Sequence, residues 1–531
     1  MRDIDYRHYL LIWASSRKKH AFNSILGTCT GPVGQSPGKI EEDDRQEIHL
    51  FGHNLLASVG WIQFLAAIVL RSLLLLKHMA SVQIHNVSHI TISPSPAHGK
   101  DPLLLLPLSF FDAIWITLPP IQRLLLFPGA TPDLHSLKSS LSTSLPLLYS
   151  LAGKLTYLPA TGDIAVACSP DDHVTFIEAK SDGDFIRLAS DEIHDVDSFL
   201  RLVPELDDPH PTLDTRVLPA PVMAVQVTKF ESGGFAVGVA VHHSMVDGRG
   251  LWQFIEAWAT ACREAEKSEV SAVIHDRTVI RHHPRGDEIA RRILKMMAPE
   301  LPINLSLKHK NQIISEKLNI EEGRSELMRR TFTISRDMIQ SIKQRANEVG
   351  NLQHSTFTVL SSLTWISLIK TKTIEDANEE TILGFIMDCR TRLNPPLKDN
   401  YLGNCLKLCC AKAKVMELVG NAGLSKACTR IKEQIDESSK DVLGGCEDWV
   451  GEIKRNAKSV NVLIAGSSSF RAYEIDFGVG CPSRTELVSM NHEGQVVLVG
   501  GRKQGEIQMS VCLSTSHMEE FTKEFSRELC V

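Results

Sequence analysis

The run Phe235–Val241 and the residues that follow it constrain the fold of this chain most. The run is short, apolar and rich in valine, which is typical of a buried strand. Turn residues at Glu231–Gly234 separate it from Val222–Thr228, which is expected to be its hairpin partner. Apolar residues then recur at helical spacing, at Leu251, Phe254, Ile255 and Trp258. The sequence therefore predicts a hairpin whose second strand leads into a helix.

Two residues with chemically useful side chains, His243 and Asp247, lie at this strand-to-helix junction. Histidine suits proton transfer near neutral pH because its ordinary pKa is about 6.5, and a general base accelerates a reaction roughly a hundred- to ten-thousand-fold. A buried structural histidine is the competing interpretation. Asp247 either orients the ring or braces the loop through an arginine. A metal site is not expected, because neighbours such as His242 and His243 point to opposite faces of a strand.

Composition narrows the class of protein. At 531 residues, with 43% hydrophobic and 23% charged residues, the chain is expected to be globular and to hold two or three domains. A net charge of −6 argues against a nucleic-acid-binding protein, which usually carries a basic face. The 12 cysteines show no paired Cys-x-x-Cys spacing, so we expect reduced thiols and a cytoplasmic location.

Residues 1–78 differ from the rest of the chain. Residues 1–53 have little amphipathic period and are expected to be poorly ordered. Leu55–Leu76 is apolar and about as long as a bilayer span, although Gln63 and Arg71 interrupt it. One interpretation is a weak membrane anchor. The favoured one is an extension upstream of a start at Met79, and membrane association is not expected.

From residue 79 onward helical and strand patterns alternate, which indicates an α/β fold. We expect one domain over residues 79–263, a crossover over 264–325 and a second domain over 326–531. Helices are expected near residues 134–148, 288–297, 337–349 and 357–370 and at the C-terminus, with Pro146 distorting the last turns of the first.

Several segments occur together in an order that matches one known family. His243–Asp247 fits an HxxxD motif, and Asp476–Gly480 fits a DFGWG motif except at Val479. Tyr401–Cys405 is similar to a YFGNC motif. The further matching segments are Phe110–Asp112, Leu151–Leu155, Asp276–Arg277 and Asp388–Pro396. In these segments the chain resembles the plant BAHD-type acyltransferases, and specifically their anthocyanin and phenolic glucoside malonyltransferase-like branch.

The resemblance implies a two-domain, chloramphenicol-acetyltransferase-like fold with mixed sheets and an inter-domain channel. It implies that His243 is the general base and that Asp247 braces the loop by pairing with an arginine, for which Arg277 is the candidate. The residues Asp476, Phe477, Gly478 and Gly480 would form a structural motif remote from the chemistry. At Val479 a smaller side chain would leave a void in a packed environment.

The resemblance also implies the reactants. Acyl-CoA would be a co-substrate and the acceptor a small molecule, with no permanently bound cofactor, no metal and a monomeric enzyme. The acyl group would be malonyl or hydroxycinnamoyl, with malonyl favoured. Because arginine binds carboxylates bidentately, Arg249, Arg390 and Arg392 are candidates for binding a malonyl carboxylate. The sequence does not identify the group that stabilises the oxyanion.

Two rival hypotheses stay open at this point. His242–Gly248 also fits the HHxxxDG signature of peptide-synthetase condensation domains, which form amides from carrier-bound thioesters. The second rival is a catalytically degenerate paralogue that binds a small molecule without turnover, to which Val479 lends some weight. The DFGVG and YLGNC segments favour the acyltransferase over both.

Overall fold

The computed structural model describes residues 81–92, 103–206, 218–264, 273–281, 283–299, 301, 327–347, 353–372, 376–456 and 459–530. The predicted extension over residues 1–78, including its apolar stretch, lies outside the described residues. By their contacts, residues Met79–Val531 form one compact unit. Among the described helices, none is both long enough and apolar enough to cross a membrane.

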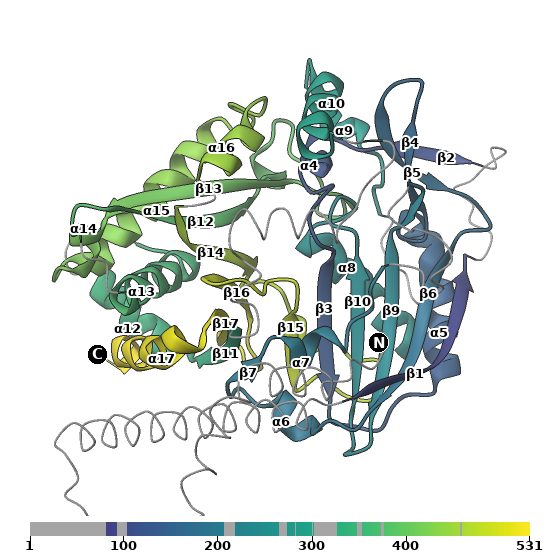
Figure 1. Ribbon diagram of the computed structural model, residues 1–531, viewed down its shortest axis with the longest axis horizontal. Helices are drawn as coiled ribbons and strands as arrows, with labels where there is room; N and C mark the ends of the chain where they lie inside the picture. Colours follow the sequence, from purple (N-terminus) through teal and green to yellow (C-terminus); the bar gives the residue numbers. More distant parts are fainter. Residues whose placement is uncertain are drawn as a thin grey trace, which may run out of the picture. The chain divides into compact units, whose positions relative to one another are not determined.

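A mixed six-stranded sheet, here called sheet A, carries the His243 loop (Figure 1). Its strands, in spatial order, are β1 (Val82–Thr91), β6 (His173–Ser181), β9 (Met223–Phe230), β10 (Phe235–Val241), β3 (Ile121–Phe127) and β15 (Arg484–Leu487). Strands β6 and β9 run parallel, and the other neighbours run antiparallel. The predicted hairpin is confirmed, with Val239 of β10 opposite Val225 of β9. Every residue of β10 is buried, as the valine run predicted.

The helix that follows β10 packs on one face of sheet A. This helix is α8 (Gly248–Arg263), and it lies against α5 (Leu134–Ser144), where the indole of Trp258 donates a hydrogen bond of 3.1 Å to the carbonyl of Leu137. The α-helix ends at Ser144 and gives way to a 3₁₀ turn, Leu145–Leu147, that contains Pro146. The expected distortion by proline is thus confirmed.

A second mixed sheet, sheet C, is built mainly from the C-terminal part of the chain. Its strands, in spatial order, are β13 (Leu406–Lys414), β12 (Glu380–Asp388), β14 (Val460–Ser467), β16 (Gln495–Gly500), β17 (Ile507–Ser514), β11 (Leu327–Ile334) and β7 (His194–Asp195). Figure 1 shows its helices beside it. They are α12 (Arg336–Asn347), α13 (Thr356–Thr371), α15 (Gly423–Lys440) and α17 (Thr515–Cys530). Of these, α12, α13 and α17 confirm the helices predicted near residues 337–349 and 357–370 and at the C-terminus, whereas α15 was not predicted. In α17, Met518, Phe521 and Phe525 are buried.

The two large sheets exchange short strands. Strand β15 comes late in the chain, yet it forms the edge of sheet A, with Leu487 opposite Arg123. Strand β7 comes early, yet it pairs with β11 of sheet C, with His194 opposite Arg329. The sequence did not predict this exchange, which joins the two expected domains by main-chain hydrogen bonds. The boundaries of these domains stay a prediction.

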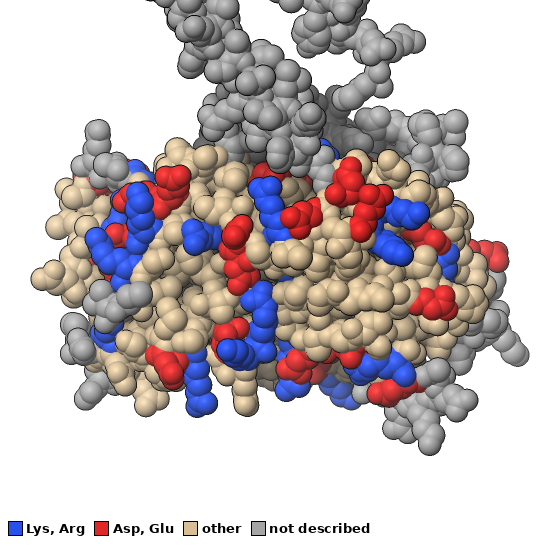
Figure 2. Space-filling model, turned by 90° about the horizontal axis from the view of Figure 1, so that it is seen from below, with Lys and Arg blue, Asp and Glu red and all other residues tan. Residues whose placement is uncertain are grey.

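The remaining elements are short. An antiparallel sheet, sheet B, consists of β2 (Leu104–Pro107), β5 (Asp163–Cys168), β4 (Lys154–Leu158) and β8 (Ala220–Pro221). The predicted helix near residues 288–297 is confirmed as α10 (Gly286–Met297). Within the part of the chain that the structure describes, the other α-helices are α4 (Phe110–Ala113), α6 (Phe185–Ala189), α7 (Asp197–Leu200), α9 (Thr278–Arg281), α14 (Val415–Val419) and α16 (Trp449–Asn456). On the face shown in Figure 2, basic and acidic side chains are interspersed and form no single basic stripe.

Candidate active site

His243 lies in the turn that joins β10 to α8. Strand β10 ends at Val241, and the amide of Met245 donates a hydrogen bond of 2.9 Å to the carbonyl of His242, which closes the turn. The imidazole of His243 stacks on the indole of Trp115, with 4.1 Å between ring centroids and 6° between ring planes. Its Nδ1 is buried and has no hydrogen-bond partner of good geometry. The ring is therefore held by packing against Trp115.

The surroundings of His243 keep its ring neutral. Burial lowers the pKa of His243 to about 4. Its own backbone carbonyl, Asp247 and Asn404 act in the opposite direction, while the charge of Arg123 lowers the pKa further. At pH 7 the imidazole is therefore unprotonated and has a free lone pair, as a general base requires.

The neighbouring histidine has a different environment. His242 is buried, and burial lowers its pKa to about 3. Its Nδ1 accepts a hydrogen bond of 3.3 Å from the amide of Ser244 and lies 2.9 Å from the Ser244 hydroxyl. His242 is thus tied to the loop backbone, whereas His243 stacks on Trp115.

Asp247 braces the loop and the start of α8. It is the N-cap of α8, and its Oδ1 accepts hydrogen bonds of 3.1 Å from the amides of Arg249 and Gly250. Its Oδ2 forms an ion pair of 2.8 Å with Nη1 of Arg390, and both side chains are fully buried. Among the described residues no hydrogen bond joins Asp247 to the His243 ring. Of the two roles left open by the sequence, the geometry favours the brace.

The prediction that Asp247 pairs with Arg277 was wrong, because Asp247 pairs with Arg390. Arg277 instead donates hydrogen bonds of 2.9 Å to the carbonyl of Met245 and 2.8 Å to the carbonyl of His275. Its Nε lies 3.6 Å from Oδ2 of Asp112, so its charge already has a buried partner. Arg277 therefore supports the loop through the backbone at Met245.

An asparagine that the sequence did not single out joins these segments. Asn404, in the segment similar to YFGNC, donates from its side chain to the carbonyl of His243 at 2.8 Å and to Oδ1 of Asp112 at 3.1 Å. The amide of the next residue, Cys405, donates to Oδ2 of Asp247 at 3.3 Å. The signal was available, because the motif had been recognised, but no residue in it had been given a role. Segments far apart in sequence thus meet at one loop and hold His243 in place.

Comparison with known proteins identifies the family of this chain. Residues 83–528 match the model of the Transferase family. The chain belongs to the Transferase family. Phenolic glucoside malonyltransferase 1 of Arabidopsis thaliana is 27% identical over 472 residues, which cover 83% of this chain and 96% of that protein. Coumaroyl-CoA:anthocyanidin 3-O-glucoside-6''-O-coumaroyltransferase 1 of the same species is 28% identical over 474 residues, which cover 84% and 97%.

The fold is shared with a solved structure, vinorine synthase, at a TM-score of 0.63 and 18% identity, over 83% of this chain and 96% of that one. The predicted chloramphenicol-acetyltransferase-like fold of mixed sheets is thereby confirmed. The resemblance to the BAHD-type acyltransferases is confirmed as well, and the protein is an acyl-CoA-dependent acyltransferase.

In this acyltransferase the DFGVG segment forms a loop away from His243. Oδ1 of Asp476 accepts hydrogen bonds of 2.7–2.9 Å from three successive amides, at Gly478, Val479 and Gly480. Gly478 and Gly480 both have a positive φ, of 89° and 93°, which a side chain would strain. Phe477 packs against the far end of α8, with its ring centroid 4.8 Å from that of Trp258.

Val479 stands where the DFGWG motif has an aromatic residue. Its side chain is half-buried and packs against the main core. Its carbonyl oxygen would lie 3.2 Å from a Cβ added at Gly129, so the backbone is close on that side. Because Val479 is only half-buried, a smaller side chain there costs less stability than it would in a fully packed environment.

The three candidates for binding an acyl carboxylate occupy different environments. Arg390 is fully buried and holds Asp247, so its expected role was wrong. Arg249 is half-buried, and its charge pairs with Asp399 at 2.9 Å and Asp388 at 3.5 Å. Arg392 is exposed and donates to the carbonyl of Asp388 at 2.7 Å. Arg249 and Arg392 stay predictions, although neither guanidinium lacks a partner.

A fourth arginine, Arg123, was missed by the sequence analysis. It lies in the middle of β3, is 2% exposed, and stacks its guanidinium over the indole of Trp252 at 5.3 Å. The signal was an arginine directly before the apolar run Leu124–Phe127, because charged residues are rarely buried in a strand.

Proposed function

We propose that this acyltransferase moves an acyl group, malonyl in preference to hydroxycinnamoyl, from coenzyme A to a hydroxyl of a phenolic or flavonoid glucoside. In this proposal His243 is the general base. The observation that carries it is a neutral, packed imidazole on a loop braced by two buried arginines, Arg277 and Arg390.

The reaction has one covalent exchange. Nε2 of His243 takes the proton of the acceptor hydroxyl while the hydroxyl oxygen attacks the thioester carbonyl carbon. The carbonyl oxygen becomes an oxyanion in a tetrahedral intermediate. The carbon–sulfur bond then breaks, the ester carbonyl forms, and the coenzyme A thiolate takes the proton from the imidazolium. The products are an acylated glucoside, free coenzyme A and a neutral His243.

Direct transfer without an acyl-enzyme is part of the proposal. Burial raises the pKa of the thiols of Cys405 and Cys389, to about 12 for Cys389, so neither is a thiolate at neutral pH. The Ser244 hydroxyl contacts His242 but is fully buried, which keeps it away from a thioester. None of these groups near the loop is therefore suited to act as a nucleophile.

The choice of substrates rests on the relatives. Two of them are named as a phenolic glucoside malonyltransferase and an anthocyanidin glucoside coumaroyltransferase, and each covers more than four fifths of this chain. The first name states transfer of a malonyl group to a phenolic glucoside. The second states transfer of a coumaroyl group from coumaroyl-CoA to an anthocyanidin glucoside. We carry the acceptor class over because the relatives share it, and the donor preference is decided by experiment.

The test uses the purified full chain with malonyl-CoA or coumaroyl-CoA and a panel of phenolic, flavonol and anthocyanin glucosides. Released coenzyme A and acylated product are quantified together. We expect transfer to at least one glucoside, and we expect His243→Ala to lower kcat/KM roughly a thousandfold. His135→Ala is the matched control, because His135 is exposed on α5. Intact-mass measurement after incubation with donor alone should show no acyl adduct.

Three outcomes would contradict the proposal. Equal turnover by the wild type and His243→Ala would remove the general base. An acyl adduct on the protein would replace direct transfer with a covalent intermediate. Binding of donor and acceptor without product from any pair would favour the degenerate paralogue.

A further inference from the structure

Arg123 is a buried cation whose hydrogen-bonding capacity is largely unused. Its Nε and Nη1 are both buried without a hydrogen-bond partner. Burial lowers the pKa of Arg123 to about 10, and Glu486 acts against this shift. An uncompensated buried charge destabilises a fold strongly, and a buried donor without an acceptor requires an explanation.

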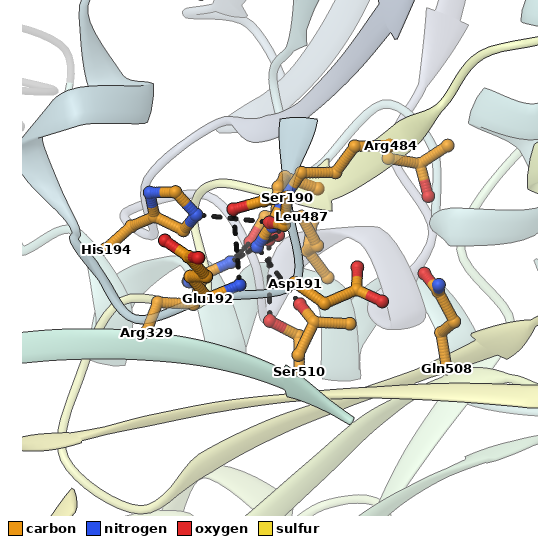
Figure 3. Close-up of polar contacts among 12 residues, drawn as sticks. Ser190, Asp191, Glu192, His194, Arg329, Arg484, Leu487, Gln508 and Ser510 are labelled. Carbon is orange, nitrogen blue, oxygen red and sulfur yellow. Dashed lines mark hydrogen bonds and ion pairs between the residues drawn. The ribbon is translucent and has the colours of Figure 1, made fainter. Parts of the chain in front are cut away.

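The carboxylate near Arg123 is already held by other residues. Oε2 of Glu486 accepts a hydrogen bond of 2.8 Å from Arg329, and its Oε1 accepts one of 2.8 Å from Arg484. Figure 3 shows Arg329 and Arg484 in this network, with Ser510 beside them. Three buried guanidinium groups thus lie near Glu486, and two of them, those of Arg329 and Arg484, already bind its oxygens.

A small hollow borders Arg123 and opens between the two large sheets. Its lining includes Arg123, Trp252 and Glu486 on the side of sheet A and Thr331 and Ser510 on the side of sheet C. The Glu486 carboxylate in this lining is the one that Arg329 and Arg484 bind. The indole Nε1 of Trp252 is a further buried donor without a partner. Arginine and tryptophan can only donate hydrogen bonds. A ligand that only accepts hydrogen bonds and carries negative charge would satisfy them, and a carboxylate has both properties.

The hollow adjoins the structure that carries the catalytic base. Nη2 of Arg123 lies 3.4 Å from the position of a Cβ added at Gly248, the first residue of α8. Trp252 is in the next turn of the same helix, and the loop before the helix holds His243. The charge of Arg123 also acts on the His243 ring. A group bound at Arg123 therefore lies beside the start of the helix that follows the His243 loop.

We propose that Arg123 binds the terminal carboxylate of a dicarboxylic acyl group, such as malonyl, while the thioester carbon faces His243. Trp252 donates to the same carboxylate, and no covalent bond changes in this step. The inference rests on the proposed function and names the residue that selects a charged acyl donor. It assigns this role to Arg123 and not to Arg249 or Arg390, whose charges pair with carboxylates, or to the exposed Arg392.

The first test compares donors that differ only in charge. With one neutral glucoside as acceptor, kcat/KM is measured for malonyl-CoA, for its neutral methyl ester and for acetyl-CoA. We expect the wild type to prefer malonyl-CoA about 100-fold, which corresponds to loss of a charge-assisted pair. This arm needs no variant and so is independent of folding defects. Equal use of malonyl-CoA and its methyl ester would overturn the proposal.

The second test uses Arg123→Met, Arg123→Lys and the control Arg330→Met. Arg330 is the neighbour of Arg329 on β11, and its Nη1 faces Thr522 of α17, away from the hollow. We expect Arg123→Met to abolish the preference for malonyl-CoA, Arg123→Lys to retain part of it, and Arg330→Met to leave it unchanged. A purely structural role for Arg123 would lower transfer from both donors equally and overturn the proposal.

Measurements of acyl-CoA binding test the role of Arg123 separately from the proposed function. Calorimetry with malonyl-CoA and acetyl-CoA on the wild type and Arg123→Met decides the role of Arg123 even where no glucoside is acylated. A tighter binding of malonyl-CoA that disappears in the variant supports the proposal, and equal affinities refute it. If Arg123→Met impairs only carboxylated acceptors in acetyl transfer, the carboxylate belongs to the acceptor and the assignment to the donor is wrong.

Discussion

The ion pair between Asp247 and Arg390 gives the sharpest prediction about the site. The substitution Asp247→Asn keeps the size of the side chain and the Oδ1 acceptor that caps α8, and removes the charge that faces Arg390 at 2.8 Å. Removing one partner of a buried pair costs about 3–5 kcal/mol. Asp388, 3.2 Å from the same Nη1, remains and brings the expected cost to the lower end, about 3 kcal/mol.

This cost translates into a measurable shift of the melting temperature. Unfolding entropy is about 2.1 cal/mol/K per residue, so the roughly 450 residues from Met79 give about 1 kcal/mol/K. Asp247→Asn should therefore lower the melting temperature by about 3 °C in differential scanning fluorimetry. It should also lower kcat, because the loop that carries His243 loses its brace.

A double-mutant cycle tests the reasoning. The double variant Asp247→Asn with Arg390→Met should lose about 1.5–3 kcal/mol less stability than the two single variants lose together. The reason is that the second change removes the charge that the first one leaves without its partner. The control is Asp247→Asn with Lys370→Met, since Lys370 pairs with Glu528 on helices of sheet C and shares no partner with Asp247. That cycle should be additive. A shift below 1 °C for Asp247→Asn, or equal coupling in both cycles, would refute the assignment of Asp247 as a brace held by Arg390.

Three further predictions follow from the structure. Burial lowers the pKa of His243 in the folded protein to about 4, so the neutral ring persists on acidification. We therefore expect kcat/KM to stay flat from pH 8 to about pH 5 and to fall below that pH. A fall centred near pH 6.5 would contradict the argument from burial. Trp115→Leu removes the ring stacked on His243, worth about 0.5–1.5 kcal/mol, and should lower kcat about 2- to 10-fold without changing the preference between donors, which rapid kinetics with both donors would check. Gly238→Ala places a Cβ 2.2 Å from the carbonyl oxygen of Leu202 and should lower the melting temperature by at least about 1–3 °C. At Gly233 a Cβ meets nothing within 4 Å, although φ is 97°. Gly233→Ala should therefore lower the melting temperature less, through backbone strain alone.

Local patterns in the sequence predicted most of the elements. The valine run of β10, its hairpin partner β9 and the helical period of α8 were all confirmed, because each depends on residues close in sequence. The exchange of β7 and β15 was not predicted. Strands of two and four residues are too short to show a period, and their partners lie far away in sequence.

The site was predictable where a motif carried it and not where partners meet through the fold. His243 and Asp247 were identified as a pair, but Asp247 was assigned to Arg277 because no local pattern says which arginine reaches a buried carboxylate. Arg390 is placed there by the turn after β12. The free donors of Arg123 follow from what surrounds it in three dimensions, and a sequence does not contain that information.

The exchanged strand β15 also has a consequence for how this enzyme is made. Until Arg484–Leu487 leaves the ribosome, the edge of β3 that it covers has no partner, and an uncovered strand edge can pair with other chains. The sheet that carries His243 therefore cannot be completed during synthesis of the first half of the chain. Neither half should be producible as a separate, well-behaved fragment, and new enzymes of this type should arise by substitution within the whole chain and not by shuffling of its halves.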